Sequence, residues 1–146
     1  KKLWLKLYVK CVVLIIKVQL RKNMKQEGSI KTMYEYKAKI VDVYDGDTFT
    51  FEVDLGFSIT VTEKIRLAGI NTPEVRGSSK VEGKMVRDYV RSIILGKEVI
   101  IQVFKKGKFG RYIAYVFFDN LTGIPCNLTE HLLQRNYGKE FMSDKF

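Results

Sequence analysis

Polar residues able to do chemistry gather where the predicted strands end. Asp45 and Asp47 flank Gly46 in an Asp-Gly-Asp turn, and a tight turn of this kind can direct a carboxylate inward as a hard oxygen ligand. Turns also use Asp-Gly for conformational reasons alone, so this motif by itself favours a structural role.

A second group of such residues follows within the segment 65–74. Arg66 lies between two apolar residues of a predicted strand, so its guanidinium needs an anion or another acceptor to offset desolvation. A structural ion pair is the alternative explanation. Asn71, Thr72 and Glu74 then cluster around Pro73, where they offer an amide oxygen, a main-chain carbonyl and a carboxylate. These residues also suit a turn that starts a helix.

A third group is the basic, glycine-rich segment 105–111. Lys105, Lys106 and Lys108 can contact phosphates without reading base sequence. A solvated hairpin tip explains the three lysines as well. Arg111, next to Gly110 at the start of the next predicted strand, is harder to explain by solvation alone.

These groups must be positioned by a small sheet. Alternating apolar residues and turn signals predict five strands, and helical spacing of apolar residues predicts two helices. The strands are expected at 36–44, 48–53, 57–67, 97–104 and 111–118, with a loop at 105–110. Five strands with a helix between the third and fourth favour a closed sheet, because an open one would leave edges exposed. The predicted fold class is α+β, mainly β: an OB-type five-stranded barrel with two or three helices.

The helix boundaries have their own signals. Ser79 to Glu82 matches a capping box at the start of the first helix, and Gly96 is typical of a helix end. Asn127 is expected to cap a second helix over 128–135, with Asn136 left-handed at its end. The predicted apolar face of the first helix consists of Val81, Met85, Tyr89, Val90, Ile93 and Ile94.

Composition limits the choice of function. A chain of 146 residues with 46% hydrophobic and 29% charged residues is long enough for one domain with a core and too short for two. Cys11 and Cys126 cannot form a disulfide framework, and the single His131 has no neighbouring Cys or His at metal-ligand spacing. Structural zinc is therefore excluded, and any metal must be held by oxygen.

The net charge of +10 is concentrated at the amino terminus. Residues 1–32 hold nine basic residues and one acidic residue, a charge of +8, while residues 33–146 hold 17 basic and 15 acidic residues, a charge of +2. Whole-chain charge is therefore weak evidence that the domain binds polyanions. The longest apolar run in the segment, 11–16, has six residues, whereas a membrane span needs about 20.

Two parts of the chain are therefore expected. Residues 1–33 form a basic, apolar segment, interpreted either as a degenerate signal or as non-native sequence that adds nothing to function. Attachment to a membrane surface is a further interpretation of this segment. Residues 34–146 form the domain.

Three motifs in order resemble the staphylococcal nuclease family, the thermonucleases. They are VYDGDTF at 43–49, IRLAGINTPE at 65–74 and FGRYIAYV at 109–116, and the resemblance covers about residues 36–140. It implies an OB-type barrel and calcium-dependent cleavage of DNA and RNA phosphodiester bonds with little sequence preference, leaving 3′-phosphate ends.

The resemblance also implies a calcium site. Asp47 matches the metal-binding aspartate, with Asp45 close behind it, and Thr72 matches the threonine whose carbonyl faces the ion. Asn71 stands at the second ligand position, where the family commonly has aspartate. One formal charge is therefore missing, and calcium affinity is expected to fall.

Catalytic roles follow from the same resemblance. Arg66 and Arg111 match the two arginines that hold the scissile phosphate, and Glu74 matches the glutamate that activates water. Phe109 replaces a tyrosine, which leaves a ring for stacking without a hydroxyl. Together with the three lysines of 105–108, it is expected to contact nucleic acid.

The expected protein is a monomeric nuclease with Ca²⁺ as cofactor, DNA and RNA as substrates, no obligate protein partner and no transmembrane span. The alternative is an OB-like module that binds nucleic acid or protein without cutting. Localisation stays open between an intracellular or phage-encoded enzyme and a secreted one.

Overall fold

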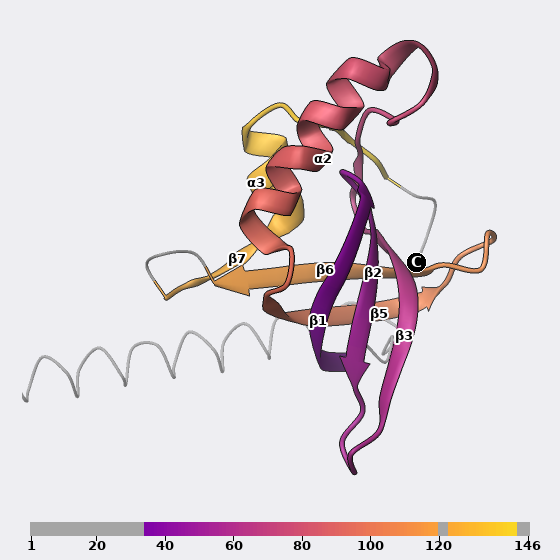
Figure 1. Cartoon of the computed structure of the whole chain (residues 1–146), viewed down its shortest axis with the longest axis vertical. Coiled ribbons are helices and arrows are strands. Elements are labelled where there is room, and N and C mark those ends of the chain that lie inside the picture. The colour runs from indigo at the N-terminus through magenta and orange to yellow at the C-terminus, as the bar shows by residue number, and fades with distance from the viewer. Residues whose placement is uncertain (1–33, 120–122, 143–146) are drawn as a thin grey trace, which may run out of the picture. The chain divides into compact units, whose positions relative to one another are not determined.

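The computed structural model describes residues 34–119 and 123–142 (Figure 1). The segment predicted at 1–33 lies outside the described residues. Five long strands make up the sheet: β1 (Tyr34–Asp45), β2 (Thr48–Asp54), β3 (Thr60–Leu67), β5 (Glu98–Lys106) and β6 (Tyr112–Asp119). All five agree with the predicted strands to within a few residues.

The five strands close into a barrel. Antiparallel pairing runs in the order β3, β2, β1, β5 and β6, and a parallel pairing between β3 and β6 joins the two ends. In that parallel pairing Arg66 lies opposite Ile113. The closing pairing covers Ile65–Leu67 of β3, and the OB-type barrel predicted from the sequence is confirmed.

Shorter elements complete the fold. They are β4 (Ile70–Asn71), the 3₁₀ turn η1 (Gly77–Ser79), α2 (Lys80–Ile94), β7 (Pro125–Asn127), α3 (Leu128–Gln134) and β8 (Lys139–Glu140). The sequence did not predict β4, β7 and β8, because segments of two or three residues carry no periodicity. No helix within the described residues is long and apolar enough to cross a membrane.

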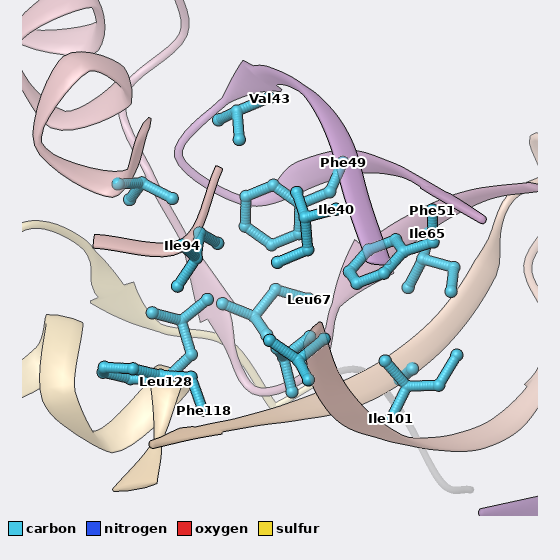
Figure 2. Packing of buried hydrophobic residues seen from close by; sticks show 14 of the residues in the cluster. Ile40, Val43, Phe49, Phe51, Ile65, Leu67, Ile94, Ile101, Phe118 and Leu128 are labelled. Carbon is cyan, nitrogen blue, oxygen red and sulfur yellow. The ribbon is translucent and has the colours of Figure 1, made fainter. Parts of the chain in front are cut away.

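The core fills the barrel and the space beneath the helices (Figure 2). Phe49 and Phe51 of β2 meet edge to face, with ring centroids 5.9 Å apart. Both rings are fully buried, as are Ile40 of β1 and Leu67 of β3. Ile94 of α2 joins them, so the helix contributes directly to the barrel core.

The predicted apolar face of α2 is confirmed in part: Val90 and Ile94 are buried, and Tyr89 and Ile93 pack against the core. Gly83 and Val86 are also buried, whereas Val81 and Met85 are exposed to solvent at 85% and 56%. The reason is Gly83, whose missing side chain lets the helix approach the main chain of the 73–74 segment. That contact sets the rotation of the helix about its axis.

Some local predictions also changed. Ser79 stands at the N-cap of α2, but its side chain makes no capping bond; its Oγ donates to the Glu74 carbonyl at 3.3 Å instead. Asn127 does cap α3, accepting from Thr129 N at 3.0 Å, and Asn136 is left-handed with φ of 57°. The predicted loop at 105–110 is shorter, because β5 continues to Lys106.

Replacement of Gly83 tests the packing of α2. A Cβ at this position would lie 2.8 Å from the Pro73 carbonyl oxygen and would overlap the Glu74 carbonyl group. We expect Gly83→Ala to lower the free energy of unfolding by about 1–3 kcal/mol, although alanine is the better helix former. Urea unfolding measures this. Lys84→Ala, at an exposed site on the same helix, should be near neutral; a stabilised Gly83→Ala would contradict the packing.

Candidate functional site

The site begins at the tight turn between β1 and β2. Gly46 in this turn is buried, and a Cβ there would lie 2.7 Å from Val86 Cγ1 and 2.8 Å from Thr72 Oγ1. Only glycine fits such an approach. The turn is therefore pressed against both α2 and the segment after β4, and Asp47 is fixed beside Thr72.

Asp47 is the buried centre of the site. Its exposed fraction is 6%, and both carboxylate oxygens have partners. Thr72 N donates to Oδ2 at 2.9 Å, and Thr48 Oγ1 donates to Oδ1 at 3.2 Å. Arg66 Nη2 lies 3.7 Å from Oδ2. These contacts offset the cost of burying the charge.

Asp45 adds a second carboxylate next to Asp47. Its Oδ1 accepts a hydrogen bond from Asp47 N at 3.2 Å. Burial, and then the negative charge of Asp47, raise the pKa of Asp45 from 3.8 to about 6. The turn thus concentrates negative charge at a partly buried point, which is the electrostatic environment that attracts a cation.

Arg66 points from β3 toward this acidic turn. Its Nη2 donates to Asn71 Oδ1 at 2.9 Å, and its guanidinium carbon lies 5.3 Å from the centre of the Phe141 ring. Phe141 is held there by its own amide, which donates to the Gly69 carbonyl at 3.1 Å. The arginine therefore has the acceptors that its position in an apolar strand requires, and part of it remains accessible.

Arg111 reaches the same turn from the start of β6. Its Nη1 donates to Thr48 Oγ1 at 3.1 Å, and Thr48 in turn donates to Asp47. The guanidinium carbon lies 5.9 Å from the centre of the Phe109 ring. Arg66 and Arg111, 45 positions apart in the chain, are thereby joined to one carboxylate.

The sequence reasoning did not single out Thr48 or Phe141. Thr48 follows the acidic turn directly and faces Arg66 across the β2–β3 pairing, so its place in the motif was an available signal. Phe141 lies outside every motif. Only the short pairing of β4 with β8 brings its segment alongside Asn71.

Glu74 follows β4 in the chain and is exposed to solvent. Its carbonyl accepts from Ser79 Oγ and packs on Gly83, so the main chain is well fixed. Among the described residues, the Glu74 carboxylate makes no ion pair. The side chain is therefore available to a substrate or to water.

The basic loop before Arg111 is partly described. The side chain of Lys105 lies outside the described residues. Lys106 Nζ lies 5.3 Å from the centre of the Tyr112 ring, Lys108 is exposed, and Phe109 is 84% exposed. Phe109, Lys106 and Lys108 are thus accessible to a large ligand.

The oxygen donors around Asp47 suit a hard cation. Two carboxylates and the Asn71 amide oxygen are of the type that calcium prefers. An amide oxygen has two lone pairs, so its bond to Arg66 leaves one available. Thr72 Oγ1 is buried and has no hydrogen-bond partner among the described residues. Those residues contain no group of three or more His, Cys, Asp or Glu side chains able to hold a metal, so any ion needs amide, carbonyl or solvent oxygens as well.

A hollow of about 320 Å³ adjoins the site. It shares Asn71 and Thr72 with the site and is otherwise lined by Pro73, Ser79, Glu82, Asn136, Gly138 and Lys139. Its walls are mainly polar.

Comparison with known proteins gives a family. The model of the staphylococcal nuclease homologue family matches residues 64–142, which is more than half of the chain and includes Arg66, Glu74 and Arg111. The acidic turn at 45–47 precedes the matched range.

Two curated proteins are similar to this chain. An uncharacterized protein of Methanocaldococcus jannaschii is 30% identical over 138 residues, covering 79% of this chain and 64% of that protein. An alanine–tRNA ligase of Buchnera aphidicola is 27% identical over 110 residues, covering 73% of this chain and 11% of the ligase. The chain thus spans less than two thirds of the length of either relative. By its family match, its motifs and its barrel, the chain belongs to the staphylococcal nuclease homologue family.

Proposed function

We propose that this chain is a calcium-dependent endonuclease that hydrolyses phosphodiester bonds of DNA and RNA. One observation carries the proposal: Arg66 on β3 and Arg111 just before β6 converge on Asp47, Arg111 through Thr48. Two guanidinium groups beside a pair of carboxylates suit a phosphate ester and a cation together.

The arginines would hold the scissile phosphate. Negative charge spreads over the phosphoryl oxygens as the barrier is approached, and donors that are already in place stabilise it most. Each guanidinium can bind two oxygens at once. Asn71 orients Arg66 and Thr48 orients Arg111, which reduces the ordering needed when substrate binds.

Glu74 is proposed as the general base. Its main chain is fixed by Ser79 and Gly83, and its carboxylate makes no ion pair within the described part of the chain. It can therefore accept a proton from a water molecule and hold that water in line with the leaving oxygen.

Asp47, Asn71 and Thr72 are proposed to hold calcium, with Asp45 behind them. When bound, the ion would offset negative charge on the phosphoryl oxygens. The raised pKa of Asp45 shows that its carboxylate is destabilised by burial and by Asp47, and a divalent cation would remove that penalty.

Recognition is proposed to be largely independent of base sequence. The proposed contacts from Arg66, Arg111 and the lysines of 105–108 are to phosphate, which carries no sequence information, and Phe109 offers a ring on which any base can stack. We propose 3′-phosphate ends, as the family resemblance implies.

Plasmid nicking is the deciding experiment. The chain should convert supercoiled DNA to open and linear forms with calcium and not with a chelator, and digestion of an end-labelled oligonucleotide should yield 3′-phosphate ends without strict sequence preference. The opposite result would be a DNA complex in a gel shift with no cleavage at any calcium concentration. That result would indicate a non-catalytic binding module.

Substitution at the site gives a sharper test. We expect Arg66→Ala, Arg111→Ala and Glu74→Gln each to lower turnover about 100-fold or more, because each removes a group that acts on the transition state. Arg87→Ala is the matched control, since that arginine pairs with Asp88 on α2. Circular dichroism should be unchanged throughout. Near-parental rates in all three site variants would contradict the site.

Asn71 tests the calcium ligands. Calcium affinity follows the number of charged ligands, so Asn71→Asp should lower the calcium concentration needed for half-maximal activity, with a smaller effect on the saturated rate. Calorimetric titration of both forms with a nucleotide present measures this directly. Unchanged or weaker calcium binding by Asn71→Asp would mean that the residue serves Arg66 and not the metal.

A further inference from the structure

A β-bulge interrupts β1 just before the acidic turn at 45–47. Val43 and Asp45 pair with the consecutive residues Phe49 and Thr48 of β2. Tyr44 is therefore an extra residue that has no opposite on β2. A bulge of this kind disrupts the ladder, bends the strand and redirects the side chains that follow it. The direction in which the acidic turn leaves β1 thus depends on how the bulge is held.

Arg91 of α2 holds this bulge. Its Nη2 and Nε both donate to the Val43 carbonyl oxygen, at 2.8 Å and 3.1 Å. Nη2 also lies 3.7 Å from Asp42 Oδ1, but the two side chains of that ion pair are 37% and 59% exposed. An ion pair so open to water contributes little. The charge-assisted bonds to the Val43 carbonyl are therefore the stronger contact.

The helix that carries Arg91 is anchored to the same strand (Figure 1). Gly96 N donates to the Ile40 carbonyl at 2.8 Å, and Ile40 N donates to the Lys97 carbonyl at 3.1 Å. Val90, next to Arg91, is fully buried in the core. The arginine thus extends from a fixed base to a carbonyl 48 positions earlier in the chain.

α2 also packs against the acidic turn itself. A Cβ at Gly46 would lie 2.7 Å from Val86 Cγ1, so Val86 limits how closely the turn can approach the helix. Arg91 acts on the strand that leads into the turn. Because its planar guanidinium directs two donors at one oxygen, it restrains the orientation of the Val43 peptide as well as its distance from the helix. The two contacts together can set both the position and the direction of the turn.

We propose that Arg91 is a positioning residue for the calcium site of Asp47, Asn71 and Thr72. It would touch neither the ion nor the phosphate. By holding the bulge, it keeps the Asp47 carboxylate beside Thr72 N, which donates to it at 2.9 Å. The inference rests on the proposed calcium-dependent function. Groups that orient metal ligands commonly change metal affinity or activity by about 10–100-fold when they are removed.

Calcium titration is the first test. We expect Arg91→Ala to raise the calcium concentration for half-maximal nicking about tenfold or more. Calorimetry with a nucleotide present should show the same loss of affinity. Arg91→Lys keeps the positive charge but replaces the planar pair of donors by a flexible ammonium, so it should recover only part of the affinity. Arg87→Ala, on the same helix, should bind calcium as the parent does.

A second control separates positioning from stability. Val90→Ala removes buried volume from α2 without touching the bulge, and it should lower the midpoint of urea unfolding by an amount comparable to Arg91→Ala. Its calcium affinity should nevertheless match that of the parent when both are measured well below their unfolding temperatures.

Amide hydrogen exchange without calcium tests the positioning directly. The Thr72 amide is bonded to Asp47 Oδ2, so its exchange rate reports how firmly the acidic turn is held. In Arg91→Ala it should exchange about tenfold faster than in the parent, relative to the amide of Phe51 in the central strand β2. In Val90→Ala the Thr72 amide should gain nothing over that of Phe51.

Two results would overturn the proposal. Parental calcium affinity in Arg91→Ala, with parental exchange at Thr72, would mean that the turn keeps its shape without the arginine. An equal loss of calcium affinity in Val90→Ala would assign the effect to general loosening of α2. A parent that binds no calcium would instead overturn the calcium site of the proposed function, and the exchange rate at Thr72 would then decide the role of Arg91 on its own.

Discussion

One buried hydrogen bond organises the site: Thr72 N donates to Asp47 Oδ2 at 2.9 Å. It joins the β1–β2 turn to the end of β4, two parts of the chain 25 residues apart. Asp47 is buried, so its carboxylate requires partners for both oxygens. The Thr48 hydroxyl and the Arg66 guanidinium complete the set, so satisfying one buried charge brings the other polar residues of the site together.

Closure of the barrel brings the two arginines to the Asp47 carboxylate. Arg66 lies opposite Thr48 in the β2–β3 pairing and opposite Ile113 in the β3–β6 pairing. Arg111 directly precedes β6 and so arrives on the same side, where Thr48 accepts its hydrogen bond. Main-chain pairing, with its regular spacing, thus positions two long and otherwise mobile side chains.

Local sequence determined the strands and the two helices, because alternation and capping by Asn127 are local patterns, and its three motifs supplied the candidate site residues. It only partly determined the buried face of α2, where Gly83 packs on the Glu74 carbonyl, and it did not determine the position of Phe141 over Arg66, which depends on the β4–β8 pairing. It also missed the left-handed turn at 56–58. These features arise from contacts between distant segments or from strain that only the folded chain can sustain, and neither leaves a periodic signal in the sequence.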